Sequence, residues 1–289
     1  MGTNSSQKVA VVTGSSSGIG FETSLLLAKN QFVTYATMRN LNKSQVYESA
    51  LKEQITLTVA QLDVNDDVSV NSAIDTIIKE HGRIDVLVNN AGYDLFGSLE
   101  EMTVKEIKAQ FETNFFGAIR ATKAVIPVMR KQRSGTIVNI SSIGGRIGLL
   151  PFNTAYHASK FALEGYTESL RHELIEFGIN VILIEPGAIG TNFINNIKTA
   201  QNYNPTDSPY AKTIQRVFEG AQVFMADTTH PREVAQVILN AVNSTSQNLR
   251  YPVGKDAESV LKRRAELSDI EMEEWARESV MEKKGFVRQ

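Results

Sequence analysis

The chain has 289 residues, 42% of them hydrophobic, which is enough to bury a full core in one large domain or two small ones. Its formal net charge of −2 gives no bias toward nucleic acid or anionic membranes. The absence of cysteine excludes disulfides and a thiol nucleophile, and four scattered histidines without paired-ligand spacing predict no metal site. No apolar run reaches the roughly 18 residues that span a bilayer. The polar start Met1–Gln7 lacks a signal-peptide core, so we expect a cytoplasmic protein.

Short β-branched runs alternate with longer helical segments over the first 187 residues. The predicted strands are Lys8–Val12, Phe32–Thr37, Ile55–Leu62, Ile84–Val88, Thr136–Ile140 and Val181–Glu185. Among the predicted helices are Ile19–Lys29, Asp67–Glu80, Val104–Lys131 and Tyr156–Phe177. Several strands are apolar almost throughout, as in sheets that are covered on both faces. The alternation predicts an α/β protein with a doubly wound parallel sheet.

The regular alternation stops after Pro186. Residues 190–228 form a long, weakly periodic stretch, which predicts a lid or binding loop. We expect a helix at His230–Asn243, a last strand at Leu249–Val253 and a charged helical tail over Lys255–Lys284. No repeat or linker divides the chain, so we predict one domain over residues 1–254 that includes the lid. Residues 255–289 are predicted to extend this domain, with the tail in a subunit interface or in solvent rather than over the lid.

A glycine-rich turn lies between the first strand and the first helix, in the sequence Thr13-Gly14-Ser15-Ser16-Ser17-Gly18-Ile19-Gly20. Glycines let the backbone turn tightly and approach a pyrophosphate, and the following helix presents unpaired N–H groups and its positive dipole end. An ordinary strand-to-helix turn is the alternative. The strand before and the helix after the turn favour a dinucleotide site.

The TGxxxGIG spacing resembles the short-chain dehydrogenase/reductase family, and further family motifs follow in order between about residues 8 and 192. They are Asn89-Asn90-Ala91-Gly92, Asn114, Ser141-Ser142, the YxxxK motif of Tyr156 and Lys160, Pro186-Gly187 and Thr191. The resemblance implies a Rossmann fold. It also implies an oxidoreductase that moves hydride between a nicotinamide cofactor and a carbonyl group or a primary or secondary alcohol.

The resemblance also assigns the cofactor-binding residues. Those expected along the pyrophosphate and ribose are Gly14, Ser16, Ser17, Gly18, Ile19 and Gly20. Asp63 and Val64 are expected at the adenine, although Asp63 is alternatively a helix N-cap or turn residue. The segment Asn90, Ala91 and Gly92 is expected beside the adenosine ribose. Pro186 and Gly187 are further expected cofactor-binding residues, and Thr191 is expected at the nicotinamide carboxamide.

The end of the second strand indicates which cofactor is preferred. NAD sites usually have an acidic residue there for the ribose 2′-hydroxyl, whereas this chain has Met38 followed by Arg39. A guanidinium makes bidentate, charge-assisted bonds to a 2′-phosphate that a carboxylate would repel. The sequence therefore predicts NADP(H), the alternative being a solvated surface arginine.

Tyr156 is the expected acid/base, with Lys160 one helical turn away on the same face. A cation about 4 Å away contributes about 4 kcal/mol at an effective dielectric constant near 20, enough to lower the pKa of Tyr156 by about three. By the resemblance, Lys160 also holds the nicotinamide ribose, Ser142 polarises the substrate carbonyl and Asn114 fixes a water that links Lys160 to solvent. Ser142 lies 14 residues before Tyr156, whereas 13 is common in the family, so Ser141 is the alternative.

Residues Tyr35–Arg39 and Gly148–Gly165 resemble the branch that contains 17β-hydroxysteroid and retinol dehydrogenases. We expect an apolar or medium-sized ketone, aldehyde or alcohol as substrate. Candidate pocket residues, each of which can equally pack in the core or the lid, are Tyr93, Phe96, Leu149, Phe152, Phe193 and Phe224. The resemblance implies a homodimer or homotetramer formed through the two long helices. A redox-inactive NADP-binding regulator and a sugar-nucleotide epimerase are the alternative functions.

Overall fold

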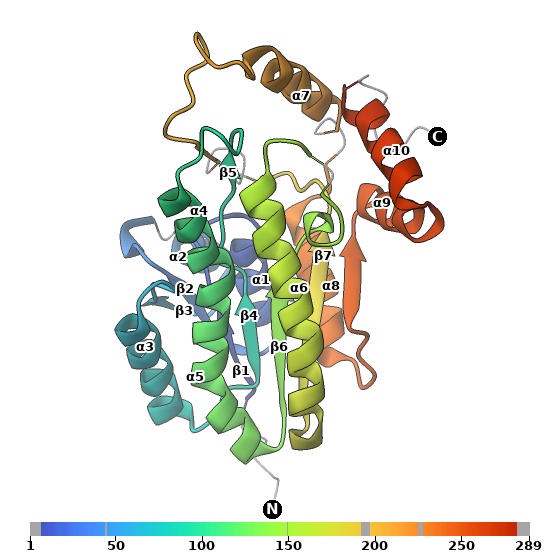
Figure 1. The fold of residues 1–289 in the computed structure, drawn as a ribbon. Helices are drawn as coiled ribbons and strands as arrows, with labels where there is room; N and C mark the ends of the chain where they lie inside the picture. Colours follow the sequence, from blue (N-terminus) through green and yellow to red (C-terminus); the bar gives the residue numbers. More distant parts are fainter. Residues whose placement is uncertain (1–6, 44, 149, 192–196, 225–227, 282–289) are drawn as a thin grey trace, which may run out of the picture.

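The computed structural model describes residues 7–43, 45–148, 150–191, 197–224 and 228–281. Seven parallel strands form its central sheet in the order β3-β2-β1-β4-β6-β7-β9. They are β1 Val9–Val12, β2 Val33–Met38, β3 Thr58–Gln61, β4 Val86–Asn89, β6 Gly135–Ile140, β7 Ile179–Pro186 and β9 Arg250–Val253. The strand order reverses between β1 and β4, which opens a crevice at their carboxyl ends. The predicted doubly wound sheet is confirmed (Figure 1).

Helices cover both faces of the sheet (Figure 1). One face packs against α1 (Gly18–Lys29) and α8 (Pro231–Asn243), and the other against α3 (Asp67–His81), α5 (Gly117–Gln132) and α6 (Thr154–Leu174). Alternate residues of β1 belong to opposite layers, with Val9 and Val11 on the α3–α5–α6 side and Ala10 and Val12 on the α1–α8 side. This burial on both faces explains why such strands are apolar throughout.

The helix predicted at Val104–Lys131 is interrupted. Its first part, α4 (Val104–Phe111), starts from a capping box in which Thr103 and Glu106 bond each other's backbone N–H groups. A π-helical turn, η2 (Glu112–Phe116), then separates α4 from α5. Short elements that were not predicted are α2 (Gln45–Lys52) and the 3-10 turns η1 (Leu41–Lys43), η3 (Ile143–Gly145) and η4 (Ile175–Phe177).

The lid and the tail form one layer beyond the carboxyl ends of the strands (Figure 1). The lid contains β8 (Lys198–Thr199), which pairs with β5 (Leu95–Phe96), and α7 (Ala211–Phe224). The tail forms two helices rather than one, α9 (Lys255–Glu266) and α10 (Asp269–Met281). Val260 and Met272 of the tail are buried together with Val217 of α7. The tail therefore covers the lid, and the prediction of an interface or solvated position is wrong for its apolar face.

Candidate active site

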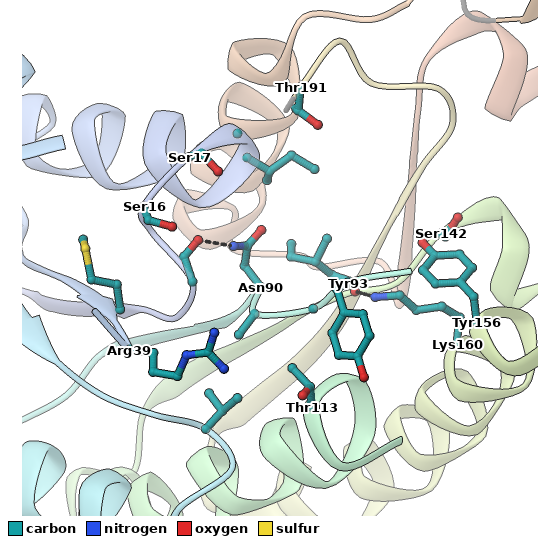
Figure 2. Close-up of a pocket in the computed structure, with 18 of the residues that line it drawn as sticks. Ser16, Ser17, Arg39, Asn90, Tyr93, Thr113, Ser142, Tyr156, Lys160 and Thr191 are labelled. Carbon is teal, nitrogen blue, oxygen red and sulfur yellow. Dashed lines mark hydrogen bonds between the residues drawn. The ribbon is translucent and has the colours of Figure 1, made fainter. Parts of the chain in front are cut away.

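A cleft of about 560 Å³ follows the carboxyl ends of the central strands. Most of the predicted site residues line it, namely Gly14, Ser16, Ser17, Gly18, Ile19, Arg39, Asp63, Val64, Asn90, Ala91, Gly92, Ser142, Tyr156, Lys160, Pro186, Gly187 and Thr191. Gly20 and Asn114 lie behind the lining and support it. Figure 2 shows that Arg39 lies at one end of the cleft, and that Ser142, Tyr156 and Lys160 lie at the other.

The glycine-rich turn has the backbone shape that its sequence predicts. Gly14 and Gly18 have φ angles of 68° and 62°, in the left-handed region that favours glycine. A Cβ atom on Gly14 would lie 2.8 Å from the Cα of Ala91. Ser17 is the N-cap of α1 and makes no side-chain capping bond, so the first N–H groups of the helix are available to an anion.

Asn90 holds this turn in place. Its Nδ2 donates to the carbonyl oxygens of Thr13 and Gly14 at 2.9 and 3.0 Å. The Thr13 hydroxyl oxygen in turn accepts from the backbone N–H groups of Asn90 and Ala91 at 3.0 and 3.1 Å. Gly20 has no room for a side chain, because its Cβ would lie 2.4 Å from Asn90 Nδ2. Asn90 and Gly20 therefore shape the turn from behind.

At the end of β2, a buried residue is followed by an exposed cation. Met38 is 2% exposed, and the exposed Arg39 borders the cleft. In the part of the chain that the structure describes, no carboxylate forms a salt bridge with Arg39. The glycine cradle, the open helix N-terminus and this guanidinium together fit a dinucleotide that carries a 2′-phosphate.

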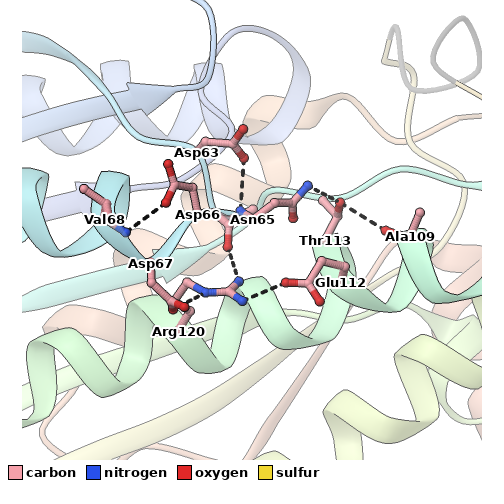
Figure 3. Close-up of polar contacts among 10 residues, drawn as sticks. Asp63, Asn65, Asp66, Asp67, Val68, Ala109, Glu112, Thr113 and Arg120 are labelled. Carbon is pink, nitrogen blue, oxygen red and sulfur yellow. Dashed lines mark hydrogen bonds and ion pairs between the residues drawn. The ribbon is translucent and has the colours of Figure 1, made fainter.

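Asp63 is a turn residue that also lines the cleft (Figure 3). Its Oδ1 accepts from the Asn65 N–H at 3.0 Å, while the N-cap of α3 is Asp66, which accepts from Val68 N at 2.9 Å. Arg120 of α5 donates to the Val64 carbonyl oxygen at 2.5 Å and so anchors the turn. Asp63 is therefore a turn residue, as the alternative prediction had it. Its place in the cleft is also compatible with a contact to the adenine.

The acid/base residues converge from β6 and α6. Ser142 follows β6 and forms a hydrogen bond with Tyr156, while its Oγ accepts from Gly144 N at 3.0 Å. Lys160 Nζ donates to the Ile140 carbonyl oxygen at 2.8 Å and lies 5.7 Å from the centre of the Tyr156 ring. Ser141 faces Glu164 instead. Of the two serines, Ser142 is therefore the one beside Tyr156.

The loop between Ser142 and Tyr156 begins with the turn η3 and packs against a buried histidine. His157 Nδ1 lies 2.8 Å from the Gly144 carbonyl oxygen, and Nε2 lies 3.4 Å from the Leu150 N–H. Nδ1 is therefore the donor and Nε2 the acceptor, as in a neutral ring. Burial also lowers the pKa of His157, which favours this neutral form.

Burial changes the acidity of both key groups. It raises the pKa of Tyr156, an effect that the Ser142 hydrogen bond opposes and the charge of Asp94 reinforces. It lowers the pKa of Lys160 to about 8, against the attraction of Glu164 and Asp94. The prediction that Lys160 lowers the pKa of Tyr156 considered only the charge of the lysine. Desolvation raises the pKa of Tyr156, and it is the larger effect here.

Asn114 lies in the π-helical turn and is 2% exposed. Its Nδ2 donates to the Tyr93 carbonyl oxygen at 2.9 Å and to Ser159 Oγ at 3.2 Å, and its Oδ1 accepts from Tyr93 N at 3.0 Å. The side chain thus joins the segment after β4 to α6. Isolated π-helical turns are frequent at functional sites.

Asp256, in the first turn of α9, is a site residue that was not predicted. Its carboxylate accepts from Ala188 N at 2.6 Å, and a Cβ on Gly187 would lie 2.1 Å from its Oδ2. Asp256 therefore shapes the Pro186–Ala188 segment of the cleft. The signal for it was its position three residues after Val253, at the same edge of the sheet as the other motifs.

The candidate substrate residues divide into two groups. Tyr93 lines the cleft, with Lys198 Nζ 4.1 Å from its ring centre. Phe96 packs in an aromatic cluster, with ring centres 6.0 Å from Phe152 and 4.8 Å from Phe218. Leu149 and Phe193 lie outside the described residues, as does the Phe224 side chain.

No group of three or more His, Asp or Glu side chains among the described residues could hold a metal ion. No helix in the same ranges combines the length and apolar character needed to cross a membrane.

Comparisons with known proteins agree with the fold and the cleft. The short chain dehydrogenase family model matches residues 8–202. Human retinol dehydrogenase 8 is 41% identical over 253 residues, which cover 84% of this chain and 80% of that protein. This similarity confirms the predicted resemblance to the branch that contains retinol dehydrogenases.

Solved structures extend the similarity to the whole fold. A short-chain dehydrogenase from Streptomyces avermitilis superimposes with a TM-score of 0.80 at 32% identity, covering 95% of this chain and 98% of that one. A metagenomic short-chain oxidoreductase in complex with NADP gives a TM-score of 0.67 at 26% identity, covering 85% and 96%.

Proposed function

The chain belongs to the short-chain dehydrogenase family, whose oxidoreductases bind a nicotinamide cofactor, and we propose that it is NADP(H)-dependent. We further propose that it interconverts a carbonyl group and an alcohol with Tyr156 as the acid/base. The observation that carries this proposal is one continuous cleft with Arg39 at one end and Ser142, Tyr156 and Lys160 at the other.

NADP(H) is preferred over NAD(H) because of Met38 and Arg39. Met38 offers no acceptor for a ribose 2′-hydroxyl, and Arg39 offers a guanidinium to a 2′-phosphate. One charge-assisted hydrogen bond contributes about 1.5–3 kcal/mol, or roughly 10- to 150-fold in affinity. The glycine-rich turn and α1 hold the pyrophosphate whichever cofactor is present.

The bound nicotinamide supplies or accepts the hydride. Ser142 orients the substrate oxygen, and Tyr156 donates a proton to that oxygen during reduction or removes it during oxidation. Lys160 binds the cofactor ribose and stabilises the tyrosinate by its charge. Asn114 supports the proton relay behind Lys160 by fixing Tyr93 and Ser159 in place. A raised pKa keeps Tyr156 protonated at neutral pH, so its hydroxyl is ready to act as the acid in carbonyl reduction there.

Two other functions fit the fold less well. A redox-inactive regulator would not need both Tyr156 and Lys160 in the cleft, where both are found. A sugar-nucleotide epimerase also uses a YxxxK motif, but usually with GxxGxxG and a larger C-terminal domain. The glycine-rich turn of this chain reads TGxxxGIG instead.

The proposed substrate is an apolar or medium-sized ketone, aldehyde or alcohol. The name retinol dehydrogenase belongs to a relative that is 41% identical, so retinal is one candidate among several. The test is a screen with NADPH and NADH across ketosteroids, retinal, β-keto thioesters and small aldehydes. We expect NADPH-dependent reduction of at least one class, and failure of every class with both cofactors would contradict the proposal.

We also propose a homodimer or homotetramer formed through the segments around α5 and α6. Phe116 and Phe161, on these segments, are each 47% exposed, which is unusual for large apolar side chains. Sedimentation should give a dimer or tetramer for the unmodified protein and smaller species for Phe116→Glu with Phe161→Glu. A monomer at micromolar concentration would contradict this proposal.

A further inference from the structure

A cluster of buried charges lies behind the acid/base residues and is assembled from four parts of the chain. Glu164 comes from α6, Glu185 from β7, Arg250 from β9 and Arg146 from the residue after η3. Arg250 Nε lies 3.0 Å from Glu164 Oε2 and 3.1 Å from Glu185 Oε1, and Arg146 lies 3.1 Å from Glu185. The side chains of Glu164 and Glu185 are only 6% and 1% exposed. Burying two carboxylates is costly, so their retention calls for a role.

Glu164 shares its arginine partner with two other carboxylates. Arg250 also pairs with Glu168, so the two arginines serve three carboxylates. Arg250 contacts Glu164 Oε2, while Oε1 is buried and the carboxylate faces the Ser141 hydroxyl. Gly145 allows the close packing here, because a Cβ at its position would lie 2.6 Å from Ser141 Oγ and 3.0 Å from Glu164 Cγ. A buried carboxylate that shares its arginine with other carboxylates is therefore held on α6.

A second cation near Glu164, besides Arg250, is Lys160, four residues earlier on the same helix. Lys160 is 7% exposed, and its Nζ has one recorded hydrogen bond, to a neutral carbonyl oxygen, although an ammonium group can donate three. The charges that favour its protonated form are those of Glu164 and Asp94. These two carboxylates approach Lys160 from α6 and from the segment before β5.

We propose that Glu164 is a positioning residue whose buried carboxylate, held in place by Arg250, is the counter-charge that keeps Lys160 protonated. The proposal rests on the proposed function only in giving this charge a role in the reaction. Without Glu164, Lys160 would be a buried ammonium with Asp94 as its one neighbouring carboxylate, and it would release its proton at lower pH.

The charged and titratable groups around Glu164 and Lys160 determine the pH range in which the two residues attract each other. Those around Glu164 are Ser141, Glu185 and Arg250, with Glu168 paired to Arg250, Arg146 paired to Glu185, and Lys160 one helical turn away. Asp94 and Tyr156 face Lys160 from the other side. Burial raises the pKa of Glu164 to about 7, and the pKa of Lys160 is about 8. Both groups are thus at least half charged between about pH 7 and pH 8, and their attraction is strongest there.

Glu164→Gln and Glu168→Gln form a matched pair of variants. Both remove one carboxylate that pairs with Arg250 on the same face of α6, one turn apart, but Glu168 is 52% exposed whereas Glu164 is buried. The full chain is labelled with ¹³C at the lysine ε-carbons, and the Lys160 signal is identified by its absence in Lys160→Arg. Titration of this signal requires no cofactor or substrate.

We expect the Lys160 titration midpoint to fall by roughly one pH unit in Glu164→Gln and to stay near the wild-type value in Glu168→Gln. Should Glu164→Gln not fold, Glu164→Met tests the same loss of charge. An unchanged Lys160 midpoint in a folded neutral variant would overturn the proposal and leave Glu164 a purely structural ion-pair partner.

The same variants give a second readout in the pH profile of carbonyl reduction. The limb that falls at high pH should move to lower pH in Glu164→Gln by the same amount as the Lys160 midpoint, and Glu168→Gln should match the wild type. A shifted midpoint without turnover in any variant would sustain the counter-charge and contradict the proposed function. Turnover with an unshifted midpoint would support the proposed function and contradict the counter-charge role of Glu164.

Discussion

The two ends of the cleft handle charge in opposite ways. At the β2 end, the cation Arg39 is exposed and has no salt-bridge partner in the described part of the chain. At the α6 end, Lys160 is buried beneath Tyr156 with carboxylates on two sides. An exposed cation is available to an incoming anion, whereas buried groups mainly set one another's protonation. The comparison teaches that the first end is suited to cofactor selection and the second to proton transfer.

The largest expected effect is at the buried end. Tyr156→Phe keeps the ring and deletes the hydroxyl, so the fold and NADPH binding should persist while turnover falls. A general acid/base typically contributes about 10²–10⁴-fold, and the loss should lie within or beyond that range. The measurements are kcat on a confirmed substrate and the Kd for NADPH, which should stay near the wild-type value. Near-normal kcat would make the hydroxyl structural and require another proton donor.

An intermediate effect is expected at the exposed end. Met38→Asp with Arg39→Ala supplies an acceptor for a 2′-hydroxyl and removes the partner of a 2′-phosphate. The ratio of kcat/KM for NADPH to that for NADH should fall by roughly 10- to 150-fold or more, reversing the preference. Arg39→Ala alone is the control, and it should weaken NADPH binding with little effect on NADH. An unmodified protein that prefers NADH would overturn the interpretation of β2.

The smallest effect sharpens the comparison by changing one buried charge. Asp94, whose pKa burial raises to about 6, accepts from Asn153 Nδ2 at 2.6 Å and raises the pKa of Tyr156. Asp94→Asn removes this negative charge, so Tyr156 should lose its proton more easily above pH 6. The rising limb of the pH profile for alcohol oxidation should move to lower pH by up to about one unit. Below pH 6 the variant and the wild type should converge, because Asp94 is then protonated.

Stability supplies the control for that variant. A carboxyl whose pKa is raised in the folded state favours its protonated form, so its ionisation costs stability as the pH rises from about 4 to about 6. Asp94→Asn removes this cost, and the Tm at pH 8 should hold or rise. A pH profile that stays unchanged in a folded Asp94→Asn protein would show that Asp94 does not act on Tyr156.

The sequence predicted the sheet well because its central strands, such as β1, β4 and β7, are buried on both faces and read as apolar runs. The interruption at Glu112–Phe116 was missed because a π-helical turn leaves the apolar periodicity of the long helix largely intact. The tail was assigned to solvent or an interface because its charges dominate, although Val260 and Met272 are buried under α7. Its apolar positions can be recognised as buried positions only once the lid is known to pack against them.

The site was predictable where it follows local spacing. The glycine-rich turn and the YxxxK motif each place their residues through one turn or one helix. Asp256 and Glu185 belong to the site through contacts with Ala188 and Arg250, each more than 60 residues away along the chain. No spacing within a motif encodes such a contact, so the structure was needed to find it.

The most direct test of the whole account is to follow the hydride itself. NADPH deuterated at the transferable C4 position is incubated with the protein and a ketone identified in the substrate screen, and the alcohol is analysed by mass spectrometry and NMR. The account predicts one deuterium on the carbinol carbon for each NADPH consumed. NADPH consumption without deuterium at that carbon, or transfer from NADH at an equal or greater kcat/KM, would contradict it.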